Sequence, residues 1–215
     1  MTWQVEASHT AEFLVSEAHG NLSRDEITVA SGADLEAGTV LGKITVGAAT
    51  PAADAGNTSG AGTIASVTVG AGAKAGVYNV ICVEPATNAG TFTVEDPDGV
   101  TVGVATVAVE FSSGGLTFTI TDATDFVAGD KFTITVADGS GKYVQFNPDG
   151  TDGRQIAKAI LFKKAIAADA DVKAVAVTRS AEVNAGALVW PADISADEKA
   201  AAVGALTSSF IIVRS

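Results

Sequence analysis

The middle of this chain alternates apolar and polar residues, and short turn-forming segments interrupt the alternation at regular intervals. The alternating runs are residues 64–69, 77–83, 91–95, 100–111, 116–121 and 132–136. Successive side chains of a strand point to opposite faces, so this period of two indicates strands with one buried face. Segments rich in Gly, Pro, Asn and Asp separate the runs and are typical of turns. Six or seven short strands at this spacing predict an antiparallel β-sandwich or a small barrel.

The two flanks of this middle region are less regular. Their patterns predict strands at residues 27–29, 35–46, 142–146, 172–178, 182–190 and 210–213. Residues 152–168 fit either one face of a helix or a buried strand. Ser195 and Glu198 form a capping box before an alanine-rich stretch, which predicts a helix at residues 196–206.

Composition divides the chain into an arm, a split domain and an insert. Residues 1–26 show no sustained period and are predicted to form an N-terminal arm, whose stretch 12–16 suits a strand added to a partner sheet. Residues 48–62 contain Pro51 and are rich in Ala, Gly, Thr and Ser, which is typical of a linker. Turn-rich segments therefore bound residues 48–139 on both sides, as expected for an inserted domain. The discontinuous remainder comprises residues 27–47 and 140–215.

The predicted fold class is mainly β (α+β). It consists of a small mixed β domain with one C-terminal helix, interrupted by an inserted antiparallel β-sandwich or small barrel. Trp190 and Pro191 end an apolar strand, and Phe210 and Ile211 open the apolar C-terminal run. Both pairs are therefore expected in the core or at a subunit interface.

Charge and composition exclude several classes of partner. Thirteen Lys and Arg residues against 25 Asp and Glu residues give a net charge of −12, which repels phosphate backbones and anionic lipids. No nucleic-acid or membrane partner is expected, although the acidity also suits a role in solubility alone. One cysteine allows no intrachain disulfide, and the chain has neither a secretory signal nor an apolar run long enough to span a membrane. We expect a soluble product made in a cytoplasm.

The motifs that resemble catalytic or metal sites are incomplete. Residues 139–142 resemble a phosphate loop, but Tyr143 stands where the Mg²⁺-binding hydroxyl is needed. His9 and His19 lie in the arm, where no predicted element holds them against a nucleophile. Residues 96–99 and 147–153 alternate oxygen donors as calcium loops do, without the later bidentate Glu. We predict ordinary turns there, with calcium left open, and neither catalytic residues, metal nor cofactor.

Four segments carry a resemblance to a known family. They are residues 11–18, 38–42, 147–153 and 188–191, and the strongest are 149–153 and 188–191 with the acidic helix start at 193–199 that follows. In order and spacing they resemble the lambda-type bacteriophage head decoration proteins (the capsid-stabilising protein D family). The resemblance covers residues 10–46 and 141–215, and it favours a strand within residues 152–168.

This resemblance implies a non-enzymatic structural protein on the outer surface of a phage capsid. It implies a homotrimer at local threefold positions that binds the major capsid protein and stabilises the expanded shell. In such proteins the arm adds a strand to the capsid protein, which is β-augmentation, and three arms per trimer multiply weak contacts. The residues expected to bind the capsid are Thr10, Ala11, Glu12, Phe13, Leu14, Val15 and Ser16.

The insert is expected to project outward as a spacer or a weakly adhesive domain, and the sequence does not separate these roles. The alternative function is a virion-surface or secreted β-sandwich module that binds carbohydrate or a host surface, which predicts aromatic side chains clustered on one face. A hydrolase is a third hypothesis, but no nucleophile or general base is held in position by a predicted element.

Overall fold

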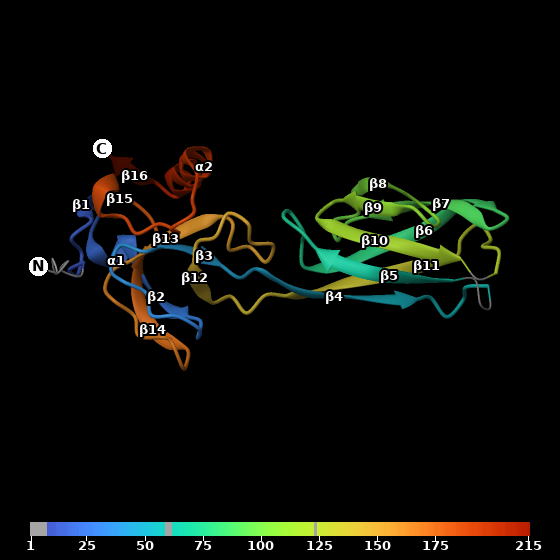
Figure 1. Cartoon of the computed structure of the whole chain (residues 1–215), viewed down its shortest axis with the longest axis horizontal. Helices are drawn as coiled ribbons and strands as arrows, with labels where there is room; N and C mark the ends of the chain where they lie inside the picture. Colours follow the sequence, from blue (N-terminus) through green and yellow to red (C-terminus); the bar gives the residue numbers. More distant parts are fainter. Residues whose placement is uncertain (1–7, 59–61, 123) are drawn as a thin grey trace, which may run out of the picture. The chain divides into compact units, whose positions relative to one another are not determined.

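The computed structural model of the chain describes residues 8–58, 62–122 and 124–215. The protein is mainly β with one long helix near its C-terminus, as the sequence predicts (Figure 1). Its elements are β1 (Leu14–Glu17), α1 (Gly20–Ser23), β2 (Arg24–Val29), β3 (Val40–Lys43), β4 (Val46–Ala53), β5 (Gly62–Val69), β6 (Gly76–Ala86), β7 (Ala89–Glu95), β8 (Thr101–Thr106), β9 (Glu110–Ser113), β10 (Leu116–Asp122), β11 (Lys131–Asp138), β12 (Tyr143–Gln145), β13 (Ala157–Leu161), β14 (Val172–Val177), β15 (Ala181–Asn184), the 3-10 turn η1 (Ala185–Ala187), α2 (Ala196–Thr207) and β16 (Ile211–Arg214).

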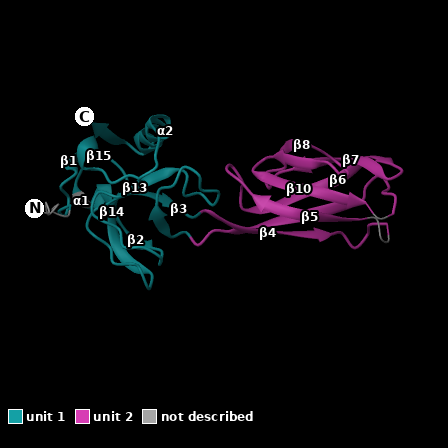
Figure 2. Cartoon of the chain, in the orientation of Figure 1, with its two compact units in different colours: residues 1–44, 141–215 teal, residues 45–140 magenta. Residues whose placement is uncertain are grey.

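The chain divides into two compact units (Figure 2). The split unit comprises Met1–Ile44 and Gly141–Ser215, and the middle unit comprises Thr45–Ser140. The two ends of the middle unit are adjacent, because the amide of Gly139 donates a hydrogen bond to the carbonyl of Thr45 at 3.0 Å. The chain therefore leaves and re-enters the split unit at neighbouring points.

The middle unit contains two antiparallel sheets that share one hydrophobic core. The sheets have the strand orders β5-β10-β9 and β4-β11-β6-β7-β8. Strands β7, β10 and β11 alternate buried and solvent-facing residues along most of their length, as the period-two pattern predicts. Buried residues from both sheets belong to a single cluster, so each sheet covers the apolar face of the other.

The linker predicted at residues 48–62 is wrong over its first half. Residues 46–53 form β4, which pairs with β11 in register, with Pro51 opposite Ile134. β4 is the outermost strand of its sheet, and an edge strand tolerates a proline that a central ladder would not. The small residues of this segment therefore form a strand because a neighbour pairs with them, which composition alone does not reveal.

The single strand predicted at residues 100–111 is also wrong. Residues 101–106 form β8 in the five-stranded sheet, whereas residues 110–113 form β9 in the three-stranded sheet. The chain turns between them at Ala108, whose φ of 60° is left-handed, and the amide of Val109 bonds to the carbonyl of Thr106 at 3.1 Å. Neither Gly nor Pro marks this turn, so the apolar pattern runs through it unbroken.

The split unit contains a small closed barrel and a separate three-stranded sheet. The barrel has the order β12-β2-β14-β13-β3, and the other sheet, which we call the terminal sheet, has the order β1-β15-β16. The sequence offered a small barrel as one form of the insert, whereas the structure has its barrel in the flanking halves. Antiparallel and parallel pairs occur together in both sheets, so this unit is mixed β as predicted.

The C-terminal flank agrees with the sequence except in one segment. Residues 157–161 form the strand β13, and α2 begins at Ala196 behind a complete capping box between Ser195 and Glu198. The strand predicted at residues 182–190 is wrong after Asn184. The side chain of Asn184 accepts a hydrogen bond from the amide of Gly186 at 2.9 Å and caps a 3-10 turn, which ends the strand early.

Candidate functional site

The terminal sheet brings together two segments that the sequence singled out, the N-terminal stretch and the C-terminal apolar run. β1 pairs antiparallel with β15, and β16 pairs parallel with the other side of β15. Within the described part of the chain, β1 and β16 are therefore the two edges of this sheet. An edge strand presents unpaired backbone donors and acceptors, which can pair with another chain.

Phe13 anchors the start of β1 in the split unit. Its side chain is 1% exposed and lies in a core cluster with Val40, Ile160 and Leu206. The carbonyl of Phe13 accepts a hydrogen bond from the amide of Asn184 at 2.7 Å. The sequence placed Phe13 in an arm without a core position, because one aromatic residue without a periodic pattern gives no sign of burial.

A turn before Phe13 holds the chain against the same unit. The Glu12 carboxylate accepts a hydrogen bond from the amide of His9 at 2.9 Å, and the amide of Leu14 donates to the carbonyl of Ala11 at 2.9 Å. The amide of Ala11 bonds to the carbonyl of Phe162 at 3.0 Å. Thr10 and Glu12 are exposed, so this turn leaves polar side chains in solvent while its backbone is fixed.

Val15 lies at an irregularity in the pairing of β1 with β15. Leu14 pairs with Val183 and Ser16 with Glu182, so β1 carries one extra residue between these pairs. A bulge of this kind redirects a side chain locally. The Val15 side chain is 59% exposed, so β1 carries an apolar group that is open to solvent.

A charged network stiffens the outward face of the terminal sheet. The Glu182 carboxylate on β15 accepts hydrogen bonds from the Ser16 hydroxyl at 2.8 Å and from the Arg214 Nε at 3.1 Å. The hydrogen bonds from Arg214 and then Ser16 lower the pKa of Glu182 below its ordinary value of 4.5. One residue from each strand takes part, so the three strands are tied across their exposed face as well as through their backbones. Sequence spacing gives no signal for this network, because its members lie far apart in the chain.

The C-terminal run alternates across the edge strand β16. Ile211 is 0% exposed and packs in the core, whereas Phe210 is 72% exposed. Phe210 lies in the turn before β16; within the strand, Ile212 and Arg214 lie on the side opposite Ile211, and Arg214 is exposed. The predicted pair is therefore divided: Ile211 contacts its own unit, and Phe210 is open to solvent.

Trp190 packs against the same core cluster as Val183 and Ile211 of the terminal sheet. The Trp190 ring packs edge-on against Phe146 with centroids 6.3 Å apart, and the Lys199 ammonium lies 5.3 Å from its centroid. Lys199 is in the first turn of α2, whereas Phe210 follows the last turn of this 12-residue helix, which spans about 18 Å. Trp190 is partly buried, and its indole N–H has no hydrogen-bond partner among the described residues.

Aspartates of the two candidate calcium loops form ion pairs with Lys and Arg side chains of this chain. The Lys74 ammonium lies 2.5 Å from Asp96 and 2.6 Å from Asp98, and Asp152 binds the Arg154 guanidinium at 2.7 Å. Among the described residues, no three His, Cys, Asp or Glu side chains gather as a metal site. Over the same residues, no helix is long and apolar enough to cross a membrane.

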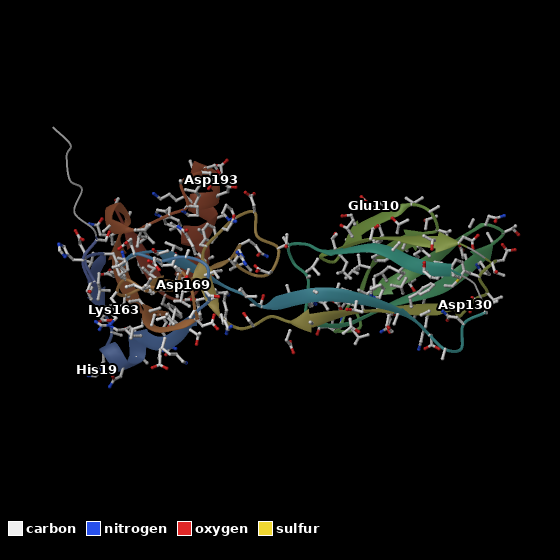
Figure 3. The ribbon with its side chains drawn as sticks, turned by 60° about the horizontal axis from the view of Figure 1, so that its bottom comes forward. His19, Glu110, Asp130, Lys163, Asp169 and Asp193 are labelled. Atoms are coloured by element: carbon white, nitrogen blue, oxygen red, sulfur yellow. The ribbon has the colours of Figure 1, made fainter. Side chains whose placement is uncertain are left out.

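The surface of the middle unit carries polar groups and scattered valines. Its six aromatic side chains, Tyr78, Phe92, Phe111, Phe118, Phe126 and Phe132, are all described, and each is at most 6% exposed. Figure 3 labels two of its acidic residues, Glu110 and Asp130, of which Asp130 is buried and accepts hydrogen bonds from the amides of Thr58 and Val127. The carboxylate of Asp130 therefore has a structural role in its loop.

Comparison with known proteins gives one informative match. The family model described as bacteriophage lambda head decoration protein D matches residues 3–87 and 66–211, two overlapping regions that together span most of the chain. No curated protein sequence matches the chain. Two crystal structures of Xanthomonas campestris FlgL, in space groups H3 and C2, align at 21% identity with a TM-score of 0.34. They cover 47% of this chain and only 33% of FlgL, and a similarity this low supports no conclusion about fold or function.

Proposed function

Because the chain belongs to the bacteriophage lambda head decoration protein D family, we propose that it binds the outer surface of the expanded head as a homotrimer at local threefold positions. Membership of this family makes it a structural protein of the phage capsid. In the proposed role it contacts the major capsid protein and other copies of itself, and it stabilises the shell without catalysis. Its net charge of −12 suits a protein that faces solvent and contacts neither nucleic acid nor membrane.

The observation that carries the mechanism is the open edge of β1. One side of β1 pairs with β15, and the other side has no strand partner within the described residues. A strand of the capsid protein that adds to this edge gains backbone hydrogen bonds, which need no particular side chains. Three such edges in one trimer act together, because binding of the first raises the effective concentration of the others.

The structure narrows the set of residues proposed to contact the capsid. Phe13 is buried in its own unit, and Ala11 and Leu14 are held by backbone hydrogen bonds of the preceding turn. Thr10, Glu12, Val15 and Ser16 keep exposed side chains. In this proposal Phe13 fixes the position of β1, and Val15 supplies the apolar contact beside the added strand.

The middle unit has a separate role in this proposal. Residues 1–26 and the discontinuous part (27–47 and 140–215) attach to the shell, and residues 48–139 form an inserted domain that projects from it as a spacer or a weakly adhesive module. A carbohydrate-binding module, the alternative function, needs exposed aromatic rings for stacking on sugars. All six aromatic side chains of the middle unit are buried, so this alternative has less support.

The experiment compares two valines of equal exposure. Val15 on β1 and Val104 on β8 are each 59% exposed, and Val15→Asp places a charge at the proposed contact while Val104→Asp does so in the middle unit. Expanded heads of the same phage that lack the protein are mixed with each variant, and bound copies per head are counted. We expect Val15→Asp to weaken binding about tenfold or more and Val104→Asp to leave it unchanged.

Two outcomes contradict the proposed function. Equal binding by both variants would exclude the edge of β1 as the attachment site. Cryo-electron microscopy of decorated heads that shows no added density at local threefold positions would exclude the decoration role itself.

A further inference from the structure

The backbone of Phe210 has a left-handed conformation that is unfavourable for a residue with a side chain. Its φ is +58°, in the left-handed region where a side chain crowds the backbone and glycine is favoured. The residue lies two positions after Ser208, the C-cap of α2. We propose that Phe210 is an anchor that inserts into an apolar recess of the major capsid protein; this inference rests on the proposed function.

The backbone of this turn is sufficient to hold its shape. The amide of Phe210 donates to the carbonyl of Thr207 at 2.8 Å, and its carbonyl accepts from the amide of Ala181 at 3.1 Å. Neither bond involves the phenyl ring, and the ring is 72% exposed. Burial within its own chain therefore does not compensate for the strained backbone. A strained residue whose ring is presented to solvent is typical of a contact site.

The surroundings of Phe210 suit an apolar partner. Within β16, Ile212 lies on the side opposite Ile211, whose side chain is buried in the core. Phe210 lies in the turn directly before this strand, and its ring is exposed. On the neighbouring strand β15, the charged residue Glu182 pairs with Ile212 in register. Its charge is balanced by Arg214, so an approaching apolar surface does not leave that carboxylate unpaired.

We take the major capsid protein as the partner because Phe210 directly precedes β16, which belongs to the same terminal sheet as the proposed attachment strand β1. The amide of Ala18, after β1, bonds to the carbonyl of Ser180 at 2.9 Å, and the amide of Ser180 bonds to the carbonyl of Ser209 at 3.2 Å. This row of hydrogen bonds places the start of β16 two strand spacings from β1, about 10 Å. Phe210 therefore lies beside the edge opposite β1, and a capsid surface that covers β1 meets the Phe210 ring if it extends about 10 Å across the terminal sheet.

The test separates an effect on folding from an effect on binding, because removing the side chain of Phe210 also relieves the strained backbone. Phe210→Gly removes the ring and relieves the left-handed backbone, so the melting temperature of the split unit should stay the same or rise, by about 1–3 °C. Binding to undecorated heads should fall about tenfold or more.

Ala108→Gly in the middle unit is the matched control, because Ala108 is also exposed and has a φ of +60°. The binding of this variant to heads should not change. Phe210→Leu, which keeps an apolar side chain, should bind heads within about threefold of the native protein.

The outcomes distinguish this inference from the proposed function. If Phe210→Gly binds heads normally while Val15→Asp does not, the anchor is wrong and the attachment edge stands. If the melting temperature falls instead, the ring supports the fold, which also overturns the inference. In decorated heads examined by cryo-electron microscopy, a ring seated against the major capsid protein supports the anchor, whereas a ring in solvent or against another copy of this chain excludes it.

Discussion

The two units of this protein build their hydrophobic cores from different side chains. The middle unit collects six aromatic side chains in one cluster between its two sheets. The split unit divides its core into two clusters built mostly from Ala, Val, Leu and Ile, with Phe13 and Phe146 as the fully buried rings. A regular period-two pattern thus yields one continuous core, whereas an irregular pattern yields several small elements around separate clusters.

The edges of the sheets differ as well. In the middle unit the edge strand β4 carries Pro51, a residue typical of edges protected against further pairing. β1 in the terminal sheet has no proline, and its bulge exposes Val15. Proline thus removes a backbone donor from the edge strand β4, whereas β1 keeps all its backbone donors and its pairing is interrupted only by the bulge at Val15.

The largest effect is expected from removal of the middle unit. Replacing residues 46–138 by a two-residue Asn-Gly turn joins backbone positions that are already hydrogen-bonded neighbours, Thr45 and Gly139. We expect the split unit to fold and to bind heads, with one thermal transition lost in scanning calorimetry. An insoluble product, or a soluble one that does not bind heads, would show that the units depend on each other.

A single core substitution should unfold only the middle unit. Phe92 is 0% exposed and packs against Phe126 and Phe132 at centroid distances of 5.0 and 6.1 Å. Phe92→Ala should cost about 3–5 kcal/mol of the free energy of unfolding, because it leaves a cavity in the hydrophobic cluster between the two sheets of that unit. Denaturant unfolding followed by near-ultraviolet circular dichroism measures the loss. Val104→Ala at an exposed site is the control, and loss of head binding by Phe92→Ala would contradict independent units.

A smaller effect is expected in the split unit from its helix cap. Ser195 accepts a hydrogen bond from the amide of Glu198 at 3.3 Å, and the Glu198 carboxylate accepts one from the amide of Ser195 at 2.8 Å. Ser195→Ala should cost about 1 kcal/mol, whereas Ser195→Asn, another good capping residue, should cost little. The two variants are compared by the melting temperature of the split unit. A shift in the transition of the middle unit would contradict the assignment.

The smallest expected effect is the response of the middle unit to acid. Hydrogen bonds from Lys74 first, and from the amides of Val100 and Asp98, lower the pKa of Asp96 below its ordinary 3.8. The ionised carboxylate therefore stabilises the folded unit above about pH 4, and this contribution is lost as the pH falls through the lowered pKa. The melting temperature of the middle unit should fall less steeply with acid in Asp96→Asn than in the native protein. Glu110→Gln, an exposed change on β9, serves as the control; identical acid profiles for Asp96→Asn and the native chain would refute the role of Asp96.

Local signals in the sequence predicted much of the fold. The capping box of Ser195 and Glu198 fixes the start of α2, and alternating runs fix β7, β10 and β11. Three of the failures share one cause. β4, the break at Ala108 and the burial of Phe13 each depend on a neighbour distant in the chain, and no local pattern reports that neighbour.

The candidate site was predictable only in part. The sequence singled out the segments Thr10–Ser16 and Phe210–Ile211, but not that β15 joins them in one sheet, nor that Glu182 and Arg214 tie that sheet together. It also could not separate Phe210 from Ile211, because adjacent apolar residues look alike until the structure shows that Ile211 begins a strand with its side chain in the core and Phe210 lies in the turn before it.

By itself, the sequence determined the β-rich class, the period of the middle unit, the C-terminal helix and the resemblance to head decoration proteins. These depend on interactions within a few residues or on motifs read in order. Only the tertiary structure decided which strands are edges, which apolar side chains stay exposed and which charges are already paired. These properties depend on contacts between distant segments. A strand is an edge because no neighbouring strand pairs with one of its sides, and an apolar ring stays exposed because the chain's own core does not cover it.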